Sequence, residues 1–131
     1  MIALDTSAVI AIVNQEPEAR SYTRLLNDAD AVVVGAPTRF EMALVASNLN
    51  PVAGESVVAA LLRRFGVTVL DWTDRHAAIA ASAYQRFGRG RHPAKLNFGD
   101  CMAYAVARAL DAPLLFKGGD FALTDVKRVT G

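Results

Sequence analysis

The chain has 131 residues, 53% of them hydrophobic and 21% charged, which indicates one compact domain over residues 1–131 with a sizeable core. Its single cysteine, Cys101, excludes an internal disulfide and favours a reducing, cytoplasmic location. The formal net charge is +1, no apolar run approaches the ~18 residues that span a bilayer, and Asp5 interrupts the apolar start, so we expect neither a membrane anchor nor a signal peptide.

Short apolar strands alternate with longer helical stretches along the chain. In chain order the pattern predicts strand 2–4, helices 7–14 and 17–27, strand 32–34, helices 37–49 and 54–65, strand 67–70, helices 73–87 and 98–110, strand 114–116 and a short fifth strand 126–129. Strands joined by helical crossovers pair in parallel, and short apolar strands suit a sheet covered on both faces. We therefore predict a three-layer α/β/α domain around a central parallel sheet of four to five strands.

Asp5 ends the first predicted strand and directly precedes a helix. In open α/β sheets the ligand crevice lies beyond the carboxyl ends of the strands, so this position presents an acid to a ligand. An aspartate before Thr6 and Ser7 is also a good helix N-cap, and the two roles are compatible.

Glu41 lies inside the predicted helix 37–49, with Leu44 and Val45 three and four residues further on. This spacing predicts that the carboxylate shares a helix face with core side chains. A buried carboxylate is costly unless it is paired or binds a metal. The alternative is an exposed or arginine-paired glutamate.

Two more acids follow in comparable places. Asp100 begins an almost wholly apolar helix, where both it and Asn97 are plausible N-caps. Asp120 follows the fourth strand through two glycines, as an ordinary turn aspartate also would. Asp5, Glu41, Asp100 and Asp120 would together form an oxygen-only site, which selects Mg²⁺ or Mn²⁺ and indicates metal-assisted phosphoryl chemistry.

Three blocks of the sequence, together with Glu41, resemble PIN-domain ribonucleases and most closely the VapC toxins of bacterial toxin–antitoxin pairs. The blocks are residues 4–8 (LDTSA), residues 92–101 (HPAKLNFGDC) and residues 114–121 (LLFKGGDF). The resemblance covers essentially the whole chain. One departure is Gly119, where relatives often carry Asn or Asp.

The resemblance implies an endoribonuclease that binds Mg²⁺ or Mn²⁺ and hydrolyses RNA phosphodiesters with a metal-activated water. It implies metal ligation and catalysis by the four acids Asp5, Glu41, Asp100 and Asp120. Thr6 or Ser7 would hold Asp5 or a metal-bound water, and Asn97 would orient the site. It also implies a cognate antitoxin protein as partner and a homodimer.

A basic segment surrounds the acidic centre. No acid occurs between Arg75 and Gly99, and several basic residues in or near this stretch are expected to contact the RNA backbone. They are Arg86, Arg89, Arg91 and Lys95, together with Lys117 nearer the last strand. The alternative is a solvated basic loop. Reading the bases would require exposed aromatic or amide side chains near the site.

Three rival functions fit the pattern less well. A haloacid-dehalogenase-like phosphatase needs a second aspartate at position 7, where Ser7 stands. A receiver-type signalling module needs an acidic pair after the first strand, which Thr6 interrupts. An interaction module that has lost catalysis would not be expected to keep all four acids.

Overall fold

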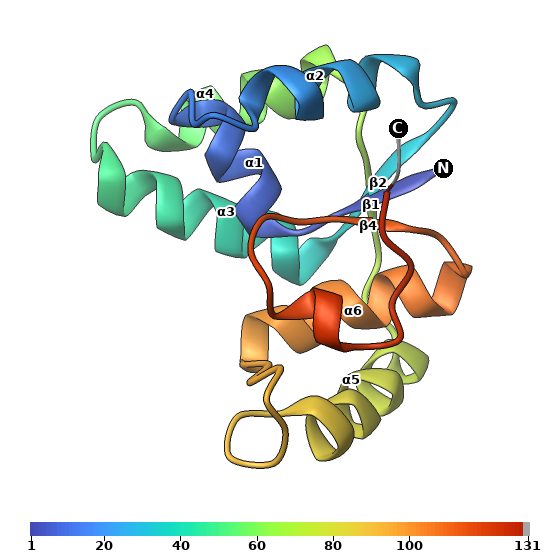
Figure 1. Ribbon diagram of the computed structural model, residues 1–131. Coiled ribbons are helices and arrows are strands. Elements are labelled where there is room, and N and C mark those ends of the chain that lie inside the picture. Colours follow the sequence, from blue (N-terminus) through green and yellow to red (C-terminus); the bar gives the residue numbers. More distant parts are fainter. Residues whose placement is uncertain (130–131) are drawn as a thin grey trace.

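The structure is a computed structural model that describes residues 1–129, and Figure 1 shows its three layers. Four parallel strands form the central sheet in the order β3-β2-β1-β4. The strands are β1 (Ile2–Leu4), β2 (Val32–Gly35), β3 (Thr68–Leu70) and β4 (Leu114–Leu115). The helices are α1 (Thr6–Val13), α2 (Ala19–Asp28), α3 (Ala36–Leu49), α4 (Gly54–Arg64), α5 (Asp74–Phe87) and α6 (Phe98–Leu110), followed by the 3₁₀ turn η1 (Phe121–Leu123). The predicted fold class is confirmed.

Each face of the sheet is covered by its own apolar core. Alternate residues of a strand point to opposite faces, so Ile2 and Leu4 pack with α1, α3 and α4, whereas Ala3 packs with α5 and α6. Figure 1 shows α1 to α4 on one side of the sheet and α5 and α6 on the other. The short, wholly apolar β1 and β2 follow from this arrangement because both of their faces are buried.

Two predicted boundaries were wrong. Helix α2 begins at Ala19 rather than at Pro17, because residues 17 and 18 form a turn. The predicted fifth strand, residues 126–129, is reduced to one parallel bridge between Leu114 and Arg128. Thr124 Oγ1 accepts a hydrogen bond from Val126 N at 3.2 Å, so the backbone is still turning where the strand was expected to begin. In residues 1–129, none of the helices combines the length and the apolar character needed to cross a bilayer.

The topology brings four chain segments to one edge of the sheet. Because all four strands are parallel, their carboxyl ends share this edge. The first turns of α1 and α3 leave β1 and β2 there, and the loop that follows β4 begins there. Figure 1 shows that α6 also starts at this side of the molecule. The edge is therefore the place where acids that are distant in sequence can meet.

We expect Gly35→Ala to destabilise the fold by about 1–3 kcal/mol, the usual cost of overpacking a core. A Cβ at Gly35, where β2 passes into α3, would lie 2.7 Å from Cγ2 of the buried Val106. Chemical denaturation measures the free energy of unfolding. Gly119→Ala is the matched control, because a Cβ there would meet no atom within 4 Å. Equal stability of the two variants would contradict this packing.

Candidate active site

Asp5 is buried at the end of β1, with only 4% of its surface exposed. Its backbone N–H donates to Leu115 O of β4 at 3.0 Å, which ties the acid to the neighbouring strand. Ser7 donates to Asp5 Oδ2 from its backbone N at 3.0 Å and from its hydroxyl at 2.5 Å. Asp5 is thus the N-cap of α1 and also presents its carboxylate at the edge of the sheet.

Ser7 connects Asp5 to the loop that follows β4. The Ser7 hydroxyl accepts a hydrogen bond from Lys117 N at 3.0 Å while it donates to Asp5. The single hydroxyl therefore sets the orientation of the carboxylate relative to that loop.

Burial raises the pKa of Asp5 from 3.8 to about 6. The hydrogen bonds from Ser7 act in the opposite direction, and the nearby carboxylates of Asp100 and Glu41 raise the pKa further. Water is a better solvent for the charged form than the protein interior is, so desolvation dominates. A cation near this carboxyl group would favour its charged form and offset the cost of burying that charge.

Glu41 reaches the same edge from α3. Thr6 Oγ1 donates to Glu41 Oε1, and a Cβ at Gly99 would lie only 1.9 Å from Glu41 Oε2. The missing side chain of Gly99 therefore makes room for the carboxylate at the first turn of α6. The predicted reason for its inward direction was wrong, because Leu44 is 49% exposed and the buried face of α3 carries other residues. The first turns of α3 and α6 contact each other through Glu41 and Gly99, and this packing places Glu41 at the edge.

Asn97 and Asp100 form a reciprocal cap at the start of α6. Asn97 Oδ1 accepts from Asp100 N at 2.9 Å, and Asp100 Oδ2 accepts from Asn97 N at 3.1 Å. Burial raises the pKa of Asp100, as do the carboxylates of Glu41 and Asp120, whereas the cap and the charge of Arg89 lower it. The cap fixes the position of Asp100. The effects of Asp100 on the pKa of Asp5, and of Glu41 on the pKa of Asp100, show that these three carboxylates lie near one another.

Asp120 is the fourth predicted acid. It lies exposed after β4, at the start of η1, and its side chain makes no capping hydrogen bond. Its charge acts on Asp100. Asp5, Glu41 and Asp100 therefore lie within electrostatic range of one another, and Asp120 lies within range of Asp100, although the four acids come from separate segments of the chain.

The donor set fits a hard divalent cation, since every candidate ligand is a carboxylate oxygen. Within residues 1–129, no three His, Cys, Asp or Glu side chains stand close enough together to hold a metal ion as they lie.

Residues 88–96, which connect α5 to α6 and which we call the basic loop, carry three of the predicted RNA contacts. The loop is closed at its base by a bridge between Gly88 and Leu96. Arg89, Arg91 and Lys95 are exposed on it. Because Arg89 influences the pKa of Asp100, the loop brings positive charge to the acidic edge.

The other two basic residues are engaged in ion pairs. Arg86 contacts Asp125 at 3.1 Å, and Asp125 also accepts a hydrogen bond from Tyr104 at 2.6 Å. Lys117 pairs with Glu16 and, at 3.2 Å, with Glu18. These contacts hold the C-terminal segment and the β4 loop against the helices.

Sequence reasoning missed Gly99 and the aromatic side chains beside the acids. Gly99 stands in the block that carries the resemblance, but its contact with Glu41 depends on the packing of α3 against α6. Phe98 is 80% exposed at the start of α6, and Tyr84 is 41% exposed on α5. Their positions in apolar helices resemble core positions, so the sequence alone gave no signal for their exposure.

Comparison with known proteins identifies the family. The family model described as PIN domain matches residues 2–127. Ribonuclease VapC36 of Mycobacterium tuberculosis is 40% identical over 125 residues, which cover 95% of this chain and 90% of that protein. Ribonuclease VapC of Mycolicibacterium smegmatis is 37% identical over 128 residues, which cover 98% of this chain and 99% of that protein.

Solved structures share the fold. The Mycobacterium tuberculosis toxin VapC20, described as cleaving the sarcin–ricin loop, superposes with a TM-score of 0.76 at 19% identity and covers 100% of both chains. VapBC2 from Rickettsia felis, bound to a DNA fragment from its promoter, gives a TM-score of 0.75 at 14% identity, with 98% of each chain covered. At these identities the likeness is one of fold.

We expect the metal-free protein to lose stability relative to the Asp5→Asn variant as the pH rises through the window from 3.8 to about 6. In this window the unfolded chain releases the Asp5 proton and the folded chain retains it. The rise of the Asp5 pKa from 3.8 to about 6 corresponds to roughly 3 kcal/mol of unfolding free energy at low pH. This contribution is fully lost once the pH exceeds the pKa of the folded protein. Urea unfolding at pH 4 and pH 7.5 in a chelator tests this, and parallel pH profiles would contradict it.

Proposed function

Because the chain belongs to the PIN domain family, we propose that it is a divalent-metal-dependent endoribonuclease and the toxin of a toxin–antitoxin pair. The observation that supports the proposal is the buried Asp5 at the carboxyl edge of the sheet, with Glu41 and Asp100 close enough to raise its pKa. The ribonuclease names of relatives that match nearly the whole chain support it. The match over residues 2–127 also supports a single domain.

We assign the metal site to Asp5, Glu41, Asp100 and Asp120. The ion would be Mg²⁺ or Mn²⁺, and when bound it supplies a water of lowered pKa and neutralises charge on the phosphate. Three neighbouring residues would set the acids in place: Ser7 orients Asp5, Thr6 orients Glu41, and Asn97 caps the helix that carries Asp100.

The substrate would be RNA, whose backbone the basic loop would contact. Arg89, Arg91 and Lys95 are exposed beside the acids, so their positive charges would offset the repulsion between the phosphates and the carboxylates. Arg86 and Lys117 would contribute less, because each already holds a carboxylate partner. The family match favours this reading over a phosphatase or a receiver-type module.

The partner would be a cognate antitoxin protein. Solved neighbours of this fold include toxin–antitoxin complexes from Klebsiella pneumoniae and Salmonella typhimurium. A homodimer is also part of the proposal. We place the protein in the cytoplasm, where RNA and a reducing environment for the free thiol of Cys101 are found.

We expect Asp5→Asn to abolish RNA cleavage and to remove stabilisation of the fold by Mg²⁺. The amide keeps the size of the side chain but removes the charge that would bind the cation. Cleavage of a labelled RNA pool and the melting temperature with and without Mg²⁺ provide two independent readouts.

Asp111→Asn is the matched control for this experiment. Asp111 lies exposed at the end of α6 in the left-handed region, with φ of 52°, where Asn is also tolerated. It should retain both activity and the Mg²⁺ effect. Cleavage by purified Asp5→Asn protein that is free of contaminating nuclease would overturn the assignment.

The double variant Arg89→Ala, Arg91→Ala should bind RNA more weakly and with a smaller salt dependence. Each lost phosphate contact lowers the slope of log K against log salt concentration by about 0.7 for single strands. The double variant Arg63→Ala, Arg64→Ala removes the same charge from α4, on the other side of the sheet (Figure 1). An unchanged slope in the first variant would exclude these two arginines from the RNA surface.

A further inference from the structure

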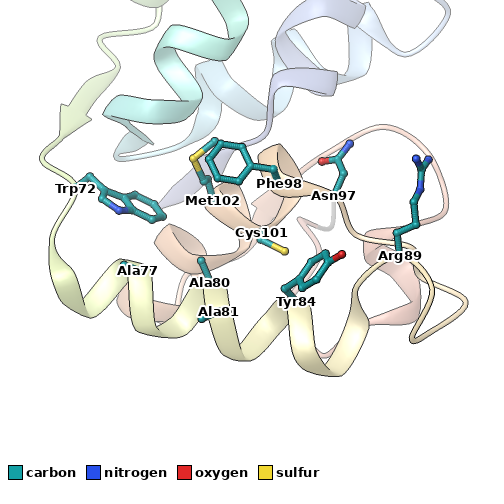
Figure 2. A pocket seen from close by; sticks show the side chains of 10 residues that line it. All are labelled: Trp72, Ala77, Ala80, Ala81, Tyr84, Arg89, Asn97, Phe98, Cys101 and Met102. Atoms are coloured by element: carbon teal, nitrogen blue, oxygen red, sulfur yellow. The ribbon is translucent and has the colours of Figure 1, made fainter.

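An apolar groove of about 580 Å³ lies between α5 and α6, immediately beside the acidic edge. Figure 2 shows Trp72 and Met102 toward one end, Tyr84 and Phe98 along the walls, and Asn97 and Arg89 toward the other end. Asn97 is also the cap that fixes Asp100. Asn97 therefore belongs both to the lining of the groove and to the cap that positions Asp100.

The aromatic rings of this groove are exposed to an unusual degree. Phe98 is 80% exposed and Tyr84 is 41% exposed. Apolar surface of this kind is unfavourable in water, and a contiguous patch of it marks a place where something binds.

The groove also has the charge of a site for an anionic ligand. No acidic side chain lines it, whereas Arg89 does. The guanidinium of Arg91 lies over the ring of Tyr84 at 5.6 Å from its centroid. Within residues 1–129, the amide nitrogen of Asn97 donates to no protein acceptor, while the amide oxygen is used by the cap of α6. Aromatic faces, cations and an amide donor thus occur together.

We propose that this groove binds an unpaired nucleobase of the RNA, next to the phosphodiester at the acidic edge. The inference rests on the proposed ribonuclease function. Unpaired bases are recognised by stacking on aromatic side chains and by hydrogen bonds to amides, while arginines contact the neighbouring phosphates. Phe98 and Tyr84 provide the stacking surfaces, and Asn97 offers a donor to a base edge. A base held there keeps the chain single-stranded beside the acids.

The charge of the lining favours RNA over a second copy of this chain as the occupant. A nucleotide uses both the rings and the cations of this groove, because its base stacks and its phosphate is anionic. Continuity with Asp100 adds to this, because Asn97 both lines the groove and caps the helix turn that carries Asp100.

The test measures RNA affinity while one protein side chain and one RNA base are removed, first separately and then together. All proteins carry Asp5→Asn and are kept free of divalent metal, so that binding is measured without cleavage. The probes are short single-stranded RNAs of mixed sequence and identical RNAs in which one position at a time is an abasic ribose. Affinities are measured for the parent protein, Phe98→Ala and the matched control Phe40→Ala, whose ring is 63% exposed on α3 and does not line the groove.

We expect the parent to prefer the intact RNA over the abasic RNA at one or two positions. Phe98→Ala should reduce that preference by about 5- to 100-fold, as the loss of one stacked base predicts. Phe40→Ala should leave it unchanged, and Phe98→Trp should retain it. The salt dependence of Phe98→Ala should equal that of the parent, because no phosphate contact is removed.

The same preference in Phe98→Ala and in the parent would overturn the proposal. Ultracentrifugation would then show whether Phe98→Ala changes the state of association, and such a change would assign the groove to a second copy of the chain. Protein with an intact Asp5 that neither binds nor cleaves RNA would instead reject the ribonuclease function. Cleavage that persists without any preference for the base would reject only the groove.

Discussion

The buried carboxylate of Asp5 is the constraint around which this molecule is organised. Its charge is held away from water at the end of a central strand, at a cost that appears as a pKa of about 6. Ser7 reduces this cost with two hydrogen bonds, and the other acids add to it. Binding of a cation or a proton would remove the remaining cost of burying the Asp5 carboxylate, so this strand end favours a positively charged ligand.

Uncharged residues position the other acids near Asp5 without neutralising their charge. Thr6 holds Glu41, and the absent side chain of Gly99 gives that carboxylate its space. Asn97 fixes Asp100 through a capping box that also starts α6. The same hydrogen bonds therefore stabilise the helices and position the acids, which explains why residues with plausible capping roles also serve the site.

The surroundings of the acids divide into two kinds of surface. The basic loop contributes positive charge that a phosphate backbone can use, and the groove between α5 and α6 contributes exposed rings. Arg86 and Lys117 have the same charge as Arg89, but their ion pairs give them a structural role in the resting protein. Charge along the sequence therefore does not by itself identify the residues available to RNA.

The sequence by itself determined the main helices, the four strands and the parallel α/β class, and it singled out the four acids as candidates, because strand ends, caps and apolar periodicity are local features. It also predicted a helix cap at the end of β1, and the hydrogen bond from Ser7 N assigns that cap to Asp5. Only the tertiary structure decided that α3 contacts α6, that Glu41 therefore lies against Gly99, and that Phe98 is exposed rather than buried. These facts depend on how helices far apart in the chain pack across the sheet, and a helix with an apolar pattern does not itself specify which of its faces a neighbour will cover.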